Sequence, residues 1–117
     1  MAQRAAEGAY WGNLADAKGR FFAVLHTTLR TQTATMTVPP GEEAGPPEVH
    51  EGEDQVFLFL EGEAEVSVWE RGPGGVPTRR GAKAGDIVVV PAGLQHGVRS
   101  VGPGPLFFFT VYGPPAY

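Results

Sequence analysis

Glycine and proline interrupt this sequence so often that little room is left for a long helix. The 117 residues include 17 Gly and 11 Pro, which gather between short runs of apolar residues. Because glycine and proline end strands and form turns, this pattern predicts many short strands rather than a disordered chain. About nine such strands predict an all-β barrel or sandwich, folded as a single domain.

The order of the runs suggests how the chain is organised. We expect an N-terminal arm over residues 1–20, with Tyr10 and Trp11 against the barrel, and a barrel domain over residues 21–117. Residues 21–38 favour two strands with a break at residues 28–30, because Phe, Val and Thr alternate with other residues there. Residues 76–82 favour a weak edge strand.

Composition excludes several classes of function. The formal charge of −4 argues against a nucleic-acid partner, which would favour a basic face. No run of eighteen apolar residues is present, so we expect no membrane span. Without cysteine there is no disulfide and no thiolate ligand. The first residues lead into no apolar segment, and we therefore expect a cytoplasmic protein.

Four residues form a candidate metal site. Glu48 and His50 are two positions apart on an expected short strand, so their side chains should share a face. His96 follows another expected strand and a Pro-x-Gly turn, and can reach the same point. Two imidazoles and a carboxylate suit a divalent transition metal. Gln55 would be a fourth, neutral ligand, or would orient a water or substrate from behind the ligands.

Each candidate ligand also has an ordinary structural explanation. His50 and His96 could be histidines satisfied by nearby hydrogen bonds, and Glu48 an ordinary surface acid. His26 stands alone on an expected strand and is taken as exposed or satisfied within the core, not as a ligand.

The spacing of Gly85, Pro91, Gly93 and His96 resembles the second conserved motif of the cupin superfamily. Ser100 stands where that motif usually has Asn.

The first cupin motif is matched in spacing and altered in chemistry. His50 and Gly62 fit it, whereas Glu48 replaces its first His and Gln55 replaces its Glu. The chain is most similar to small bacterial cupins that are loosely likened to mannose-6-phosphate isomerase, over about residues 20–115. The resemblance implies a jelly-roll β-barrel (a double-stranded β-helix) with a metal site in its mouth.

Two kinds of function follow from these expectations. The first is a metal-dependent enzyme of isomerase or dioxygenase type, using Fe, Mn, Ni or Zn on a small oxygen-rich molecule such as a sugar derivative, keto-acid or enediol. The second is a non-catalytic module that binds or senses a small molecule or a metal. The altered first motif favours the second, and no catalytic residue is assigned.

We also expect a homodimer. Residues 56–60 and 106–111 are apolar on both faces of their expected strands. One small barrel cannot bury both faces, so a second copy should cover one of them.

Overall fold

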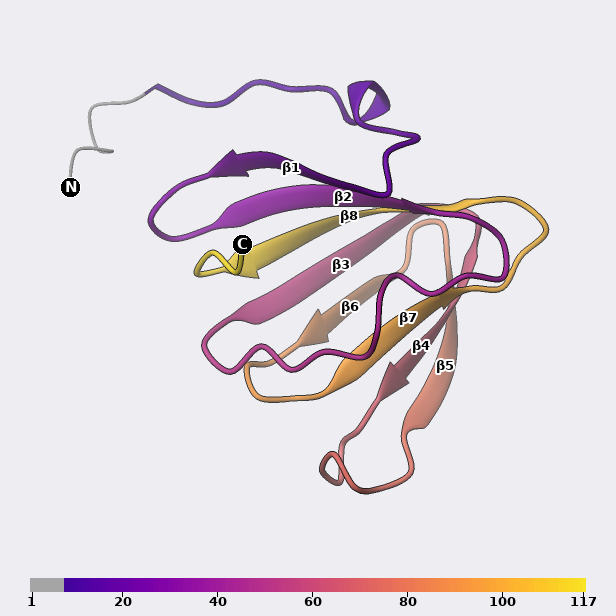
Figure 1. The fold of residues 1–117 in the computed structure, drawn as a ribbon. Coiled ribbons are helices and arrows are strands. Elements are labelled where there is room, and N and C mark those ends of the chain that lie inside the picture. The colour runs from indigo at the N-terminus through magenta and orange to yellow at the C-terminus, as the bar shows by residue number, and fades with distance from the viewer. Residues whose placement is uncertain (1–7) are drawn as a thin grey trace.

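The computed structural model describes residues 8–117, which form eight β-strands and one turn of 3-10 helix (Figure 1). The strands are β1 (Phe22–Thr27), β2 (Gln32–Val38), β3 (Asp54–Glu61), β4 (Glu63–Val68), β5 (Thr78–Lys83), β6 (Ile87–Val90), β7 (His96–Ser100) and β8 (Leu106–Gly113). The 3-10 turn, η2, spans Leu14–Asp16.

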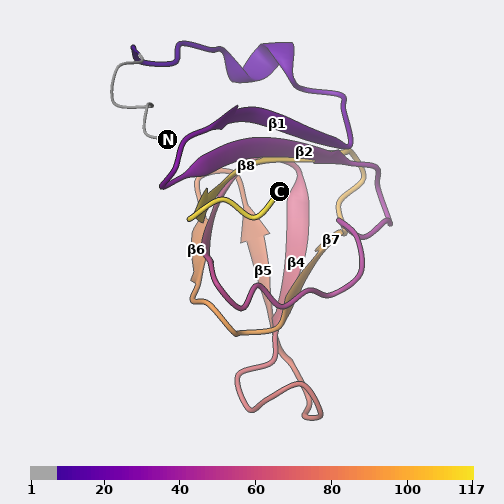
Figure 2. The same ribbon diagram turned by 60° about the vertical axis from the view of Figure 1, so that its left-hand side comes forward.

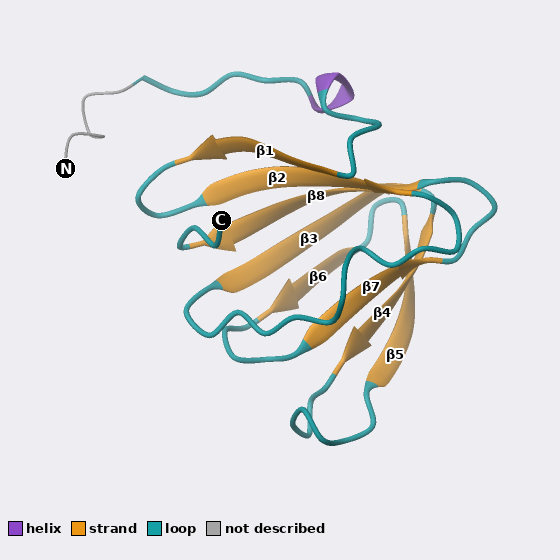
Figure 3. Ribbon diagram, in the orientation of Figure 1, coloured by secondary structure: helices purple, strands orange, loops and turns teal. Residues whose placement is uncertain are grey.

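The strands form two antiparallel sheets that face each other across the core (Figure 3). The larger sheet has the order β1-β2-β8-β3-β6, and the smaller one has the order β5-β4-β7. The all-β expectation is confirmed, as are the two strands before residue 39 and the edge position of β5.

Alternation along the strands builds the core between the sheets. Phe57 and Phe59 on β3 and Phe108 on β8 point inward, with their ring centroids 5.4–6.0 Å apart. All three are almost fully buried. The smaller sheet contributes Val66 and Val98 to the same cluster. Burial of these side chains is the main stabilising contribution to the barrel.

Two motif glycines form turns at the two ends of β6. Gly85 and Gly93 have φ angles of +93° and +86°, a region that residues with a Cβ rarely adopt. The Gly93 N–H donates a 2.8 Å hydrogen bond to the carbonyl of His50, and the Gly85 N–H donates one to the carbonyl of Phe59. The second motif thus fastens the segment that carries the first.

The segment before β1 differs in part from its expectation. Tyr10 stacks on His26 with ring centroids 4.8 Å apart. Trp11, however, is 89% exposed, so the expectation that it packs against the barrel is wrong. Figure 2 shows this segment running over β1 and β2. Within residues 8–117, no helix is long and apolar enough to cross a bilayer.

The expected short strand at Glu48 and His50 is also wrong. The chain between β2 and β3 is a long loop, in which Glu48 makes one isolated bridge with His96. Its N–H donates to the His96 carbonyl at 2.9 Å, and the His96 N–H donates to the Glu48 carbonyl at 3.0 Å. A single bridge fixes Glu48 beside His96 and leaves His50 to be placed by its own contacts.

Candidate metal centre

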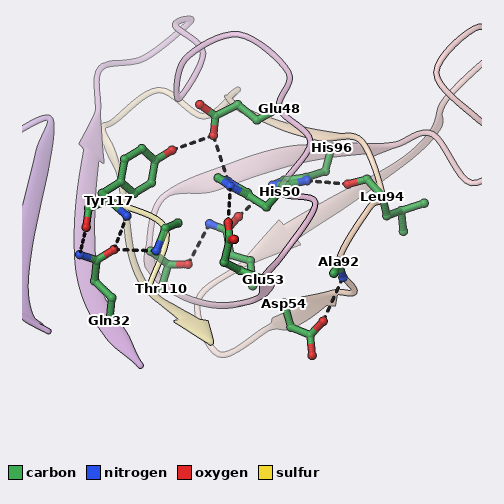
Figure 4. Close-up of polar contacts among 12 residues, drawn as sticks. Gln32, Glu48, His50, Glu53, Asp54, Ala92, Leu94, His96, Thr110 and Tyr117 are labelled. Carbon is green, nitrogen blue, oxygen red and sulfur yellow. Dashed lines mark hydrogen bonds and ion pairs between the residues drawn. The ribbon is translucent and has the colours of Figure 1, made fainter. Parts of the chain in front are cut away.

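Glu48, His50 and His96 lie close together (Figure 4), and Gln55 contacts His96. Glu48 and His50 come from the long loop, Gln55 is the second residue of β3, and His96 is the first residue of β7. Gln55 and His96 are buried, and the Glu48 side chain is 46% exposed.

His96 is held by acceptors at both ring nitrogens. Nδ1 lies 3.0 Å from the carbonyl oxygen of Leu94, and Nε2 lies 2.9 Å from Gln55 Oε1. Burial is the largest effect on His96, and it lowers the pKa below 6.5. A neutral imidazole has a single N–H, so it can donate to only one of these oxygens.

The amide of Gln55 is oriented by a second contact. Its Nε2 donates to the Thr110 hydroxyl at 3.0 Å, and that hydroxyl donates to the carbonyl of Val56 at 2.8 Å. Gln55 therefore turns its oxygen toward His96. If His96 Nδ1–H donates to Leu94, the Nε2 lone pair faces the lone pair of Gln55 Oε1, and two acceptors oppose each other with no proton between them.

His50 repeats this arrangement with carboxylates. Its Nδ1 lies 3.3 Å from Glu53 Oε1, and its Nε2 lies 3.2 Å from Glu48 Oε1. The buried Nε2 makes no hydrogen bond, so the contact with Glu48 is close but poorly aligned. Buried polar atoms without a partner are rare and point to a missing proton or ligand.

The four side chains form two pairs rather than one closed set. The pairs are Glu48 with His50 and Gln55 with His96, and the two imidazole ring centroids lie 5.7 Å apart. As placed, no three His, Cys, Asp or Glu side chains among residues 8–117 converge closely enough to share an ion.

Sequence reasoning missed the residues that surround these pairs. The Tyr117 hydroxyl donates a 2.9 Å hydrogen bond to Glu48 Oε1. Burial and then this hydrogen bond raise the pKa of Tyr117 to about 12, so the phenol stays protonated. The ring of Tyr112 is buried beside the site, with its centroid 5.4 Å from that of His50. Burial raises the pKa of Tyr112 still further above its usual value.

Of the residues that surround the two pairs, only Glu53 could have been connected with the site from the sequence. An acid three residues after His50 can reach its ring, whereas an acidic loop is more often a solvated rim. Tyr112 and Tyr117 reach the site because the last strand and the segment after it lead there. No local sequence pattern reveals that course of the chain.

Comparison with known proteins agrees with this architecture. The cupin domain family matches residues 34–112. A protein of Bacillus halodurans superposes with a TM-score of 0.86 at 25% identity, covering 96% of this chain and 86% of its own. An RmlC-like cupin family protein with a double-stranded β-helix fold, from Methanocaldococcus jannaschii, has a TM-score of 0.69 at 24% identity, over 93% of this chain and 92% of its own.

A third structure, a predicted oxalate decarboxylase from Thermotoga maritima, has a TM-score of 0.68 at 25% identity, over 80% of this chain and 79% of its own. No curated protein matches the chain. The jelly-roll expectation is confirmed by these superpositions. The family match spans most of the sequence. The barrel, the turns and the two motif segments agree with it, and this chain therefore belongs to the cupin family.

Proposed function

We propose that this protein is a small metal-dependent cupin that acts on a small oxygen-bearing molecule. Glu48, His50, Gln55 and His96 would hold one divalent transition metal, such as Fe, Mn, Ni or Zn. Such an ion, when bound, supplies a Lewis acid or a redox centre.

One observation carries this proposal. Each imidazole has its Nδ1 beside an oxygen acceptor and its Nε2 facing a second oxygen, 2.9 Å away for His96 and 3.2 Å away for His50. Acceptors behind Nδ1 fix a histidine in the tautomer that presents Nε2 to a metal. In that tautomer, a cation bound by both atoms of each pair would remove the repulsion between their facing lone pairs.

The two pairs must move together for a single ion to touch all four side chains. The backbones of Glu48 and His50 are held by the bridge to His96 and by the Gly93 hydrogen bond, so this movement is a rotation of their side chains and requires no change in the sheets. The residues behind the ligands are already in place: Leu94 and Glu53 orient the imidazoles, and Thr110 orients the Gln55 amide.

A non-catalytic binding module is the second candidate, and a specific observation favours it. Tyr112 and Tyr117 stand at the site with ring centroids 5.3 Å apart, and Tyr117 already uses one oxygen of Glu48. Such crowding leaves less room for a reacting molecule beside the ion. An isomerase or dioxygenase type of reaction needs room for a molecule to rearrange at the ion or for dioxygen to bind beside it, whereas holding one small molecule in place does not.

Elemental analysis of untagged protein tests the metal. The parent should contain or take up about one equivalent of metal. The His50→Ala/His96→Ala double variant should take up none, and the His26→Ala variant should match the parent because His26 lies away from the site. A parent that refuses every added metal, or a double variant that binds as much as the parent, would contradict the proposal. Circular dichroism spectra of all three proteins establish that they are folded.

Turnover separates the two candidates once metal is bound. Hydroxy-ketones and keto-acids incubated with metal-loaded protein, with and without dioxygen, would be consumed by an enzyme of either type. Binding without any consumption would favour the module.

A further inference from the structure

A cavity of about 210 Å³ opens beside the proposed ligands. Its polar lining comes from Glu48, Gln55 and His96, together with the hydroxyl-bearing side chains of Tyr112 and Tyr117. A molecule bound to the metal through an oxygen would therefore have to place the rest of its atoms in this cavity.

Most of the other side chains that line the cavity are apolar. Phe57 and Phe108 line it from the larger sheet together with Met36, and Val98 lines it from the smaller sheet. All four belong to the buried core of the barrel, so this wall is preformed rather than assembled from mobile loop residues. Phe22 completes the cavity at its more exposed side.

The cavity also lacks a partner for an anionic group. None of the described residues that line it is Lys or Arg. Arg99 is on the neighbouring strand β7, but its guanidinium points to the surface and pairs with Glu43 at 3.3 Å. A phosphate group on the body of a ligand whose head occupies the metal would lose its hydration among the apolar lining residues without gaining a cationic partner.

We infer that the ligand of this site has a compact apolar body, such as one ring, and a single oxygen-donor head of no or low charge. The inference rests on the proposed function, because the metal receives the head. An apolar cavity of about 150 Å³ is known to accept a benzene ring, so this cavity has the size for one ring and a few more atoms. Phosphorylated sugars do not match such a wall.

Three hydroxy-ketones test this inference, because they share a head and differ in the body. They are 2-hydroxyacetophenone, dihydroxyacetone and dihydroxyacetone phosphate. Calorimetry on zinc-loaded protein should show the phenyl compound binding at least about tenfold more tightly than dihydroxyacetone, because the ring leaves water. The phosphate should bind most weakly. Equal or tighter binding of dihydroxyacetone or its phosphate would overturn the inference.

A matched pair of variants places the ring in the cavity. Phe22→Ala removes one lining ring and should weaken binding of 2-hydroxyacetophenone several-fold while leaving dihydroxyacetone unchanged. Trp11→Ala removes an aromatic residue that is 89% exposed and lies outside the cavity, and should change neither. Equal losses in the two variants would show that the ring binds elsewhere, which also overturns the inference.

Metal-free protein distinguishes this inference from the proposed function. The apolar wall does not depend on the metal, so the phenyl compound should remain the tightest of the three there, although weaker. If no metal binds but this order persists, the proposed function fails, and the part of the inference that concerns the apolar body stands. If metal binds and the order is reversed, the inference fails alone. No measurable binding of 2-hydroxyacetophenone to either form overturns it as well.

Discussion

Both the oxygen and the nitrogen of the Gln32 side-chain amide form hydrogen bonds with the backbone of Tyr117. Its Oε1 accepts the Tyr117 N–H at 2.8 Å, and its Nε2 donates to the Tyr117 carbonyl at 2.7 Å. The same oxygen accepts the Ala116 N–H at 3.2 Å. Gln32 is 2% exposed and begins strand β2, so a rigid part of the barrel holds residues 116–117 across the site.

Replacement of Gln32 by Ala should destabilise the protein and release this segment. Each hydrogen bond of a buried amide contributes about 1 kcal/mol, and the freed backbone groups recover part of that loss in water. We expect the free energy of unfolding to fall by about 2 kcal/mol, measured by urea denaturation. Gln32→Glu keeps the acceptor for the two N–H groups and loses the donor to the Tyr117 carbonyl. Gln32→Glu should therefore also weaken the hydrogen bonding between residue 32 and Tyr117. Unchanged stability of the Gln32→Ala variant would contradict this account.

Tyr117→Phe tests whether the phenol positions Glu48. The ring and its packing against Tyr112 remain, and only the hydrogen bond to Glu48 Oε1 is lost. Loss of a group that orients a metal ligand typically lowers metal affinity by about tenfold to a hundredfold. We expect zinc affinity, measured by competition titration, to fall by an amount near the lower end of that range. The Glu48 side chain is 46% exposed and retains other orientations.

Stability provides the control for Tyr117→Phe. This hydrogen bond lies at the surface, so the urea midpoint should hardly change. Unchanged zinc affinity would show that the phenol does not position Glu48.

Sequence reasoning captured the parts of the structure that depend on local patterns. Gly85, Pro91 and Gly93 fix turns through their own conformations, so the position of His96 at the start of β7 could be predicted from spacing alone. The β-forming residues of 21–38, with the alternation in 32–38, predicted β1 and β2, and residues 76–82, which include Arg79 and Arg80, predicted the edge strand β5.

Tertiary contacts decided what the sequence patterns left open. Glu48 and His50 look like a strand because they are two residues apart, yet only Glu48 pairs, through its bridge to His96. The orientation of Gln55 depends on Thr110, which is 55 residues away in the chain. Tyr117 reaches Glu48 only because Gln32 holds its backbone, and no local pattern connects those three residues.

The pKa of His96 predicts how the stability of the metal-free protein varies with pH. Burial lowers this pKa in the folded state, so the unfolded chain binds the proton more readily. The stabilisation that belongs to neutral His96 is therefore fully present above about pH 6.5, and is lost as the pH falls toward the folded-state pKa.

Urea denaturation in the presence of a chelator checks this dependence. Between pH 7.5 and pH 5 the parent should lose more stability than the His96→Gln variant, which has no proton to take up at this position. Both proteins retain His26 and His50, so the difference between their slopes reports on His96. Identical pH dependence would contradict the prediction.

The outer face of the larger sheet is the surface on which we predict a homodimer. Val56 pairs with Val89, and Leu58 pairs with Ile87, so these four side chains lie together on the face opposite the buried rings of β3. Val56, Val89 and Ile87 are 37%, 59% and 66% exposed. Contiguous apolar residues on a sheet face are typical of an interface, and a two-fold axis would pair this face with its own copy.

Light scattering after size-exclusion chromatography measures the mass directly. The parent should elute as a dimer at micromolar concentration, and Ile87→Glu/Val89→Glu should elute as a folded monomer, because two carboxylates per copy would be buried at the interface. Val76→Glu is the matched control, since Val76 is 84% exposed in the loop between β4 and β5 and lies away from this face. A monomeric parent, or a double variant that remains dimeric, would exclude this face as the interface.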